Sequence, residues 1–381
     1  MLGLRPSRLA AAVAVAASLI VTAAACGGSG SSGSGSPGSG SSSSGSPAAA
    51  APLSQAQLIA GSRHEKGLIM YSNALPSQMN LVNKAFQAKY PWIHVTSTDY
   101  EDPVIFSKYA AEHATGARTA DILIASAPAL WVGAVSNGYL QPFTPAGISS
   151  FPSLTSQGKG LYVLSPDPSI TIFNKLQLKG QAPPTTIAQI AQGAVAGKYK
   201  IATYTLTDNF AFSAMWGYVH QYGWAALQQL GQTTKTVGDG YVIGQDVAQG
   251  GFNVGVFESG LARGPIETVP ADHKLLGWEY TKDFTPLVPR GIGITTGAAS
   301  PDSAKLFLNF VFSNQGQQVM CDAGFEASSN TFTPADGCPN TLKALYAALG
   351  GAQHTYMTPF SQQVATGQAT FTARLRQAFG Q

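Results

Sequence analysis

The sequence predicts an α/β protein with two lobes, each a mostly parallel sheet covered by helices. Three observations lead to this fold class. Short apolar runs of strand length alternate with amphipathic runs of helix length, the order typical of βαβ units. A second series of such units begins near residue 199, after a β-rich segment at Leu161–Asn174. About 330 residues follow the Gly- and Ser-rich N-terminal segment, enough for two lobes of ordinary size.

The first 50 residues predict export and tethering. Residues 1–25 carry only two charges, Arg5 and Arg8, and are otherwise largely apolar, which predicts a signal peptide. A transmembrane helix is the alternative, but the run is short and ends in small residues. Residues 26–50 begin with Cys26 and otherwise consist almost wholly of Gly, Ser, Pro and Ala, a composition that cannot bury a core. We expect a flexible linker there.

Composition argues against several functional classes. The chain has 22 basic and 19 acidic residues, and loss of the two signal-peptide arginines leaves a formal charge near +1. No stripe of Lys and Arg with interleaved aromatic residues is present, so we expect no nucleic-acid partner. The sequence contains no P-loop, GxSxG or HExxH motif, so we expect no enzyme activity and no cofactor. The histidines show no recognised metal-ligand spacing, so no metal site is predicted.

The three cysteines have two expected roles, one as a lipid attachment site and the other two as a pair. Residues 23–26, AAAC, resemble a bacterial lipobox, which implies that Cys26 is diacylglycerated and becomes the mature N-terminus. Cys321 and Cys338 remain as a pair in a compartment that permits disulfides, and a structural bridge is the expected role. A redox or metal role is the alternative, without a CxxC motif in its favour.

In the first lobe, strands alternate with covering helices. Leu68–Met70 is an uninterrupted apolar run, as expected for a strand buried on both faces. Pro76 and Ser77 provide the start of a helix that Pro91 ends. Further strands are expected at 93–99 and 120–125, and further helices at 53–60, from 103 and at 128–135.

The rest of the sequence predicts a segment that crosses between the lobes, a second α/β region and a segment that leads back to the first lobe. Leu161–Asn174 predicts two β-rich pieces separated by a proline-containing turn, a segment suited to a crossing between lobes. Asp208 is placed to cap a long helix. Strands are expected at 199–203 and 252–257, and residues 288–295 are expected to lead the chain back into the first lobe. Helices are expected at 209–230, from 300, near 340–349 and at 372–379.

Five segments together resemble the extracellular solute-binding proteins of ABC importers, in particular the group with iron(III)-binding and thiamine-binding receptors. The most specific is PDSAKLFLNFVFSNQGQQVM, which begins at Pro301 and matches the family pattern A-x-x-F-x-x-F-x-x-S-x-x-G-Q. The other four are GLIMYSNALP, GARTADILIAS, YVLSPDPSITIFNK and the strand at 197–205. The resemblance implies a type II periplasmic-binding-protein clamp whose lobes close on a solute by hinge motion.

This resemblance sets the expected domains and partners. Lobe 1 is expected to comprise residues 51–165 and 286–381, and lobe 2 residues 166–285. The implied function is to capture a small molecule between the lobes and deliver it to a permease driven by a separate ATPase. The implied location is the outer face of the cytoplasmic membrane, where the lipid anchor holds the exported protein.

The expected binding residues follow from the position of strand and helix ends. In doubly wound sheets, ligands collect outside the carboxyl ends of the strands, where helix N-termini present free amide hydrogens. Capping or ordinary surface exposure is the alternative role for each residue. The candidates are Tyr71, Ser72, Asn73, Asp99, Tyr100 and Ser126 from lobe 1, and Thr207, Asp208, Asn209, Phe257, Glu258 and Ser259 from lobe 2.

An organic solute is expected ahead of iron. Iron-binding members of the group carry two adjacent tyrosines near the strand FNVGVFESG, whereas this chain has Phe257 and Glu258 there and no Tyr-Tyr pair. Aromatic residues could stack on a flat or cationic ligand, with Asp99 or Glu258 opposite an amine. Alternatives that remain open are an iron(III) receptor of the same fold, a secreted hydrolase and a surface sensor without transport.

Overall fold

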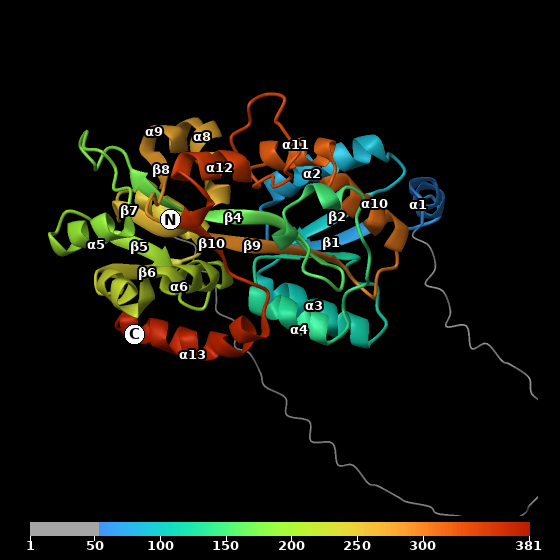
Figure 1. The fold of residues 1–381 in the computed structure, drawn as a ribbon, viewed down its shortest axis with the longest axis horizontal. Helices are drawn as coiled ribbons and strands as arrows, with labels where there is room; N and C mark the ends of the chain where they lie inside the picture. Colours follow the sequence, from blue (N-terminus) through green and yellow to red (C-terminus); the bar gives the residue numbers. More distant parts are fainter. Residues whose placement is uncertain (1–52) are drawn as a thin grey trace, which may run out of the picture. The chain divides into compact units, whose positions relative to one another are not determined.

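The computed structural model describes residues 53–381 (Figure 1). In this part of the chain, strands form one mixed sheet in the order β2-β1-β3-β9-β4-β7-β5-β6, with β10 beside β9 and β8 beside β4. Two groups of parallel strands stand at the ends of that order, and the antiparallel strands β4 and β9 join them. The α/β fold class predicted from the sequence is therefore confirmed. The predictions for residues 1–50 lie outside the described residues.

The first parallel group is built as the sequence predicts. The apolar run at residues 68–70 becomes the centre strand β1, which pairs in parallel with β2 on one side and β3 on the other. Pro76 and Pro128 begin covering helices, because a proline at the first helical position costs no hydrogen bond. The elements are α1 Gln55–Ser62, β1 Leu68–Ser72, α2 Pro76–Lys89, β2 Val95–Asp99, α3 Asp102–Ala114, β3 Ile122–Ala125 and α4 Pro128–Ser136.

The second parallel group has β5 at its centre, between β6 and β7. Asp208 caps the long helix α6 by accepting a hydrogen bond from the Ala211 backbone nitrogen at 2.9 Å, as predicted. Gly223 interrupts this helix with a φ of 75°, a conformation that glycine adopts without strain. The elements are α5 Ile187–Val195, β5 Ile201–Tyr204, α6 Asn209–Gly231, β6 Thr234–Gly238, α7 Gly240–Ala248, β7 Val254–Ser259, α8 Arg263–Thr268, α9 Pro270–Leu275 and β8 Leu276–Tyr280.

The crossing segment is one strand, so the predicted proline-containing turn is wrong. β4, Leu161–Asn174, pairs with β9, Thr285–Ile294, as far as Pro168, and with β7 and β8 from there onward. Pro166 and Pro168 lie two residues apart, so their missing N–H groups share one edge of the strand. The edge of β4 that faces away from β9 has no partner strand at the prolines, because β7 begins to pair only at Ser169. The missing N–H groups therefore break no hydrogen bond of the sheet.

The C-terminal third adds helices to both groups of strands. Helix α10 packs against α1, and its apolar face lies in the core formed by β1, β3 and α2. Cys321 and Cys338 are joined by a disulfide, with their Cα atoms 6.2 Å apart. The elements are α10 Pro301–Val311, α11 Asn314–Asp322, α12 Leu342–Leu349, β10 Thr355–Met357 and α13 Gln362–Ala378, with short 3-10 turns at Ile148–Ser150, Ser153–Thr155, Gly260–Ala262 (η3) and Ala352–His354.

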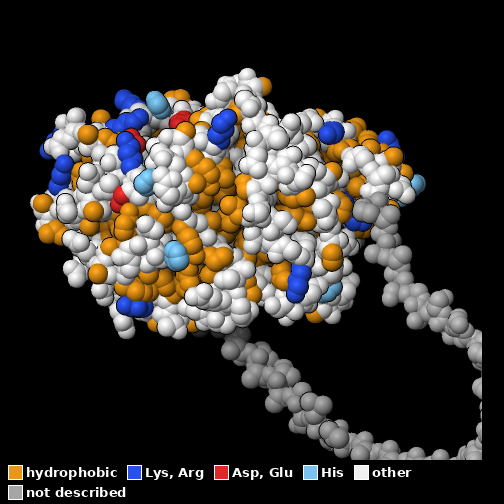
Figure 2. Space-filling view, in the orientation of Figure 1, with side chains coloured by type: hydrophobic (Ala, Val, Ile, Leu, Met, Phe, Trp, Pro, Cys, Tyr) orange, Lys and Arg blue, Asp and Glu red, His pale blue; other side chains and the backbone are white. Residues whose placement is uncertain are grey.

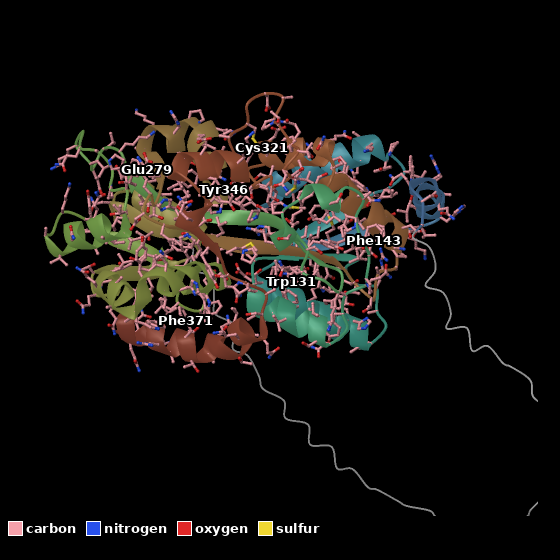
Figure 3. The ribbon with its side chains drawn as sticks, in the orientation of Figure 1. Trp131, Phe143, Glu279, Cys321, Tyr346 and Phe371 are labelled. Atoms are coloured by element: carbon pink, nitrogen blue, oxygen red, sulfur yellow. A yellow bond between two sulfur atoms is a disulfide. The ribbon has the colours of Figure 1, made fainter. Side chains whose placement is uncertain are left out.

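Helix α13, which is expected in lobe 1, contacts both groups of strands. Its Phe371 and Leu375 lie in the core cluster of the β5 group. Phe371 contacts Trp216 and Trp224 with ring centroids 4.9 and 4.7 Å apart. The same helix also packs against α4 of the β1 group, and it runs beneath α6 in Figure 1. Figure 3 labels Phe371 on this helix. Helix α13 therefore touches both groups.

No helix between residues 53 and 381 combines the length and the apolar character needed to cross a membrane.

Candidate functional site

The carboxyl ends of β1, β2 and β3 meet at one edge of the sheet and are tied together by hydrogen bonds. The Tyr100 backbone nitrogen donates to the Ser72 carbonyl at 2.9 Å, and the Asn73 nitrogen donates to the Ile124 carbonyl at 3.2 Å. The Ser126 nitrogen donates to Asp102 Oδ1 at 3.1 Å. The six predicted residues of this half therefore lie at one edge, as parallel pairing requires.

The ends of β5 and β7 and the starts of α6 and α7 form the second half of the site. Tyr204, at the end of β5, donates its hydroxyl hydrogen to Glu258 Oε2 at 3.3 Å, and its oxygen accepts from the Ser259 nitrogen at 3.3 Å. Asp239 caps α7 by accepting from the Val242 nitrogen at 2.9 Å. Carboxyl groups therefore stand at the N-termini of α6 and α7 and near the end of β7.

Electrostatic interactions couple the two halves. Burial and the nearby Asp208 carboxylate raise the pKa of Asp102 to about 7. Burial raises the pKa of Asp208 to about 6, and the charges of Glu101 and Asp239 raise it further, against the hydrogen bond from Ala211. Burial, Asp239 and Asp99 also raise the pKa of Glu101. Carboxyl groups from both halves thus act on one another, with Asp102 buried and Glu101 and Asp239 exposed to solvent.

Glu258 is the most deeply buried of these acids. Its side chain has no exposed surface, and Oε1 has no hydrogen-bond partner among the described residues. Burial raises its pKa well above the ordinary value, and the charges of Asp208 and Asp239 add to this, whereas the hydrogen bond from Tyr204 lowers it. A buried carboxyl oxygen without a partner is costly, so this oxygen is a candidate contact for a bound group.

One guanidinium lies beside this acidic region. Arg290, on β9, pairs with Asp167 of β4 at 2.7 Å, and both side chains are almost fully buried. Its remaining nitrogen donates to Asn73 Oδ1. The charge of Arg290 acts to lower the pKa of Asp99 and Asp102, although burial outweighs it in both. The strands that join the two halves thus hold a cation already neutralised by its own partner.

Aromatic rings flank the acidic residues in each half. Tyr71 meets Tyr100 edge to face, with centroids 5.2 Å apart, and Tyr204 stacks on Phe210 at 5.8 Å. Burial, together with the hydrogen bond that Tyr71 donates to Glu112, raises the pKa of Tyr71 to about 12, so its phenol stays protonated.

Three tryptophans near strand and helix ends pack against protein groups. The buried Trp131, labelled in Figure 3, donates to the Ala125 carbonyl at 3.0 Å. Trp216 lies against Phe371 in the core. Trp278 is partly buried and donates to Glu267 at 2.9 Å.

Several predicted site residues have other contacts in the structure. Phe257 is buried in the core beside Tyr218, with a φ of 60°. Asn209 accepts from Gln368 of α13 at 3.1 Å. Ser259 caps the η3 turn, and the side chain of Thr207 is exposed.

Sequence reasoning missed acidic members of the region. Glu101 and Asp102 follow Asp99 directly, and Asp239 precedes Gly240 at the start of α7. A signal was present in each case, because an acid before an apolar helical run is typical of an N-cap. Arg290 carries no comparable signal, because only the pairing of β9 with β4 places it beside Asn73.

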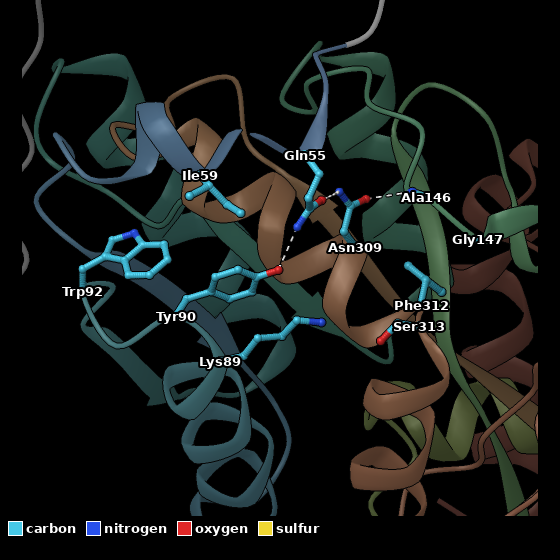
Figure 4. Close-up of a pocket in the computed structure, with 10 residues that line it drawn as sticks. All are labelled: Gln55, Ile59, Lys89, Tyr90, Trp92, Ala146, Gly147, Asn309, Phe312 and Ser313. Atoms are coloured by element: carbon cyan, nitrogen blue, oxygen red, sulfur yellow. Dashed lines mark hydrogen bonds between the residues drawn. The ribbon is translucent and has the colours of Figure 1, made fainter. Parts of the chain in front are cut away.

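Two hollows on the surface lie away from this site. One of about 620 Å³ is formed beside α1 and includes Tyr90, Trp92 and Asn309 (Figure 4). Another of about 430 Å³, beside β9 and β10, includes Leu287, Tyr356 and other apolar side chains. Figure 2 shows hydrophobic side chains gathered over this central part of the face. Neither contains a predicted site residue. Among the described residues, no group of three or more His, Cys, Asp or Glu is arranged to hold a metal ion.

Comparison with known proteins gives a family and a fold. Residues 68–326 match the family described as "Bacterial extracellular solute-binding protein". No curated protein matches the chain. Solved structures with less than 25% sequence identity share the fold of this chain. They include an ABC-transporter substrate-binding protein from Agrobacterium tumefaciens, with 23% identity, a TM-score of 0.72 and coverage of 83% of this chain and 96% of that one.

Two further structures have the same fold. The periplasmic binding protein AfuA from Actinobacillus pleuropneumoniae, with fructose-6-phosphate bound, has 16% identity and a TM-score of 0.66, covering 82% of this chain and 98% of that one. Iron-bound HitA from Pseudomonas aeruginosa has 14% identity and a TM-score of 0.62, covering 83% and 99%. The periplasmic-binding-protein fold predicted from the sequence is confirmed, and the chain belongs to the family of bacterial extracellular solute-binding proteins.

Proposed function

We propose that this protein captures a small organic solute between its two groups of strands and delivers it to the permease of an ABC importer. The observation that carries the proposal is the meeting of strand and helix ends from both groups at one site. Charges from both groups act on the same carboxyl groups there, as between Asp102 and Asp208. In an α/β protein this is the position that ligands favour.

The connecting strands support a clamp. The partners of β4 change from β9 to β7 and β8 near Pro168, close to the boundary at residue 165 expected from the sequence. We assign residues 51–165 and 286–381 to one lobe and 166–285 to the other, with α13 packed across both. A solute that contacts both lobes binds the closed form more tightly than the open one, and so shifts the population toward closure.

A thermal-shift panel followed by calorimetry tests the proposal. The panel contains amines, thiamine, iron(III) citrate, sugars and fructose 6-phosphate. One solute class is expected to raise the melting temperature and to bind with a measurable heat. Tyr71→Ala and Glu258→Ala are expected to weaken that binding while the far-ultraviolet circular dichroism stays unchanged. Full affinity in both variants would contradict the placement of the site.

We further propose that Cys26 carries a lipid that anchors the exported protein to the outer face of the cytoplasmic membrane. The sequence AAAC at residues 23–26 supports this assignment. Metabolic labelling with an alkyne fatty acid is expected to mark the wild-type protein and not Cys26→Ser, which is expected in the medium instead of the membrane fraction. Equal labelling of the two proteins would contradict the anchor.

A further inference from the structure

The site described above holds many carboxyl groups and few cations. Arg290, the cation that acts on it, is already paired with Asp167. A solute with a single positive charge could pair with only a small part of the carboxyl groups that Arg290 leaves unpaired. The carboxyl groups of the site are Asp99, Glu101 and Asp102 from one half and Asp208, Asp239 and Glu258 from the other.

Unpartnered polar atoms in each half supply a second, independent observation. Ser126 is 1% exposed and its hydroxyl oxygen has no partner among residues 53–381, although its backbone nitrogen binds Asp102. In the other half, Glu258 Oε1 is buried and also lacks a described partner. Native proteins rarely leave such atoms without hydrogen bonds, and an ammonium group can donate up to three.

The surroundings of these atoms favour an ammonium over a metal ion or an anion. No described group of acids has the arrangement of a metal site. The N-termini of α6 and α7 already hold the carboxylates of Asp208 and Asp239, so they offer an anion no free positive pole. The partly exposed ring of Tyr100 can contact a methylene chain or an ammonium group.

We propose that the solute is a flexible aliphatic diamine or triamine, with one ammonium group between Asp102 and Asp208 and another near Glu258 and Asp239. This assignment rests on the proposed function and names its substrate class. Carboxyl groups of both halves would contact the same solute molecule. The bound solute would therefore hold the two halves together.

Proton release is expected to accompany binding. Asp102 faces Asp208, Glu101 and Arg290, and Glu258 faces Tyr204, Asp208 and Asp239. These surroundings favour protonated carboxyl groups in the empty site, and an arriving ammonium favours the ionised form. The affinity for the amine should therefore fall as the pH is lowered from about 7.5 to about 5.5.

Calorimetry with a matched series of four-carbon compounds tests the assignment. The probes are 1,4-diaminobutane, n-butylamine and 1,4-butanediol, which carry two, one and no positive charges. The diamine is expected to bind at least about tenfold more tightly than the monoamine, and the diol not at all. Titrations at pH 6.5 in two buffers of different ionisation enthalpy are expected to show protons released. Equal affinities for all three, or a binding diol, would overturn the proposal.

Three variants locate the charges. Glu258→Gln and Asp102→Asn keep the side-chain size and are expected to weaken the diamine at least about tenfold. Asp246→Asn removes the same charge from the far end of α7 and is expected to change affinity less than about twofold. If fructose 6-phosphate or iron(III) citrate binds and both amines fail, solute capture stands and the diamine assignment is wrong. If equal losses occur in all three variants, the diamine does not bind at this site.

Discussion

At the scale of single residues, the buried carboxyl groups determine how the protein responds to pH. An acid whose pKa is higher in the folded than in the unfolded state binds more protons when folded. For Asp102 this difference extends from the ordinary value of 3.8 to about 7. The stabilising contribution of Asp102 is fully present below the pKa of the unfolded state. It is lost as the pH rises through the pKa of the folded state.

The solute-free protein is therefore expected to become less stable between pH 4 and pH 7. For Asp102 the loss is on the order of 2 to 4 kcal/mol, because one pKa unit corresponds to about 1.4 kcal/mol. Asp102→Asn should flatten this dependence, since the amide does not titrate. Urea unfolding at several pH values measures it. Stability that rises from pH 5 to pH 7 equally in both proteins would contradict the assignment.

Residues also show where sequence reasoning stops. Asp99 and Glu258 were found because they follow recognisable strands, and Asp208 because it precedes a recognisable helix. Phe257 follows the same logic, yet its side chain turns into the core beside Tyr218. Sequence position gives the end of a strand, but side-chain direction there depends on local backbone angles, which at Phe257 include a positive φ.

At the scale of elements, strong apolar periodicity predicted the helices and strands that form the two cores. Helix α6 begins at its predicted cap, and β1 covers its predicted apolar run. The short strand β6 and the helix α7 were missed, because β6, TKTVG, has a weak apolar pattern. The turn predicted in β4 was wrong, because the prolines lie on an edge that lacks a partner there.

The disulfide is expected to stabilise the element that it closes. Cys321 lies near the end of α11, and Cys338 lies 17 residues later, after a segment without regular secondary structure. Replacing both cysteines by serine should lower the free energy of unfolding by roughly 3 kcal/mol, because the unfolded chain regains the entropy of that loop. Denaturant unfolding measures the loss. Reduction of the wild-type protein should match it and leave the double variant unchanged, whereas equal midpoints before and after reduction would contradict the prediction.

At the scale of the whole molecule, a buried ion pair joins residues assigned to different lobes. Arg263 of α8 lies 2.7 Å from Glu326, and both side chains are almost inaccessible to solvent. Arg263 also donates to the Tyr280 hydroxyl at 2.5 Å. Nearby, the buried Leu261 packs in the core of the β1 group. These contacts hold the η3 and α8 region against that group.

Removing the charge of one partner of this ion pair should lower the free energy of unfolding. Glu326→Gln leaves Arg263 buried without its counter-charge, and a loss of about 3 to 5 kcal/mol in the free energy of unfolding is expected. The variant should also have a larger radius of gyration in solution X-ray scattering without solute. Asp246→Asn, which breaks no ion pair, is the control. An unchanged radius and an unchanged stability would show that the pair does not hold the lobes together.

Helix α13 has a consequence for how the protein is made. The rings of Phe212, Trp216 and Trp224 depend on Phe371 for part of their cover, yet that phenylalanine comes far later in the chain. A nascent chain that ends near residue 290 would leave those rings open to water. During synthesis the middle region therefore gains its full apolar cover only after the segment around Phe371 has emerged.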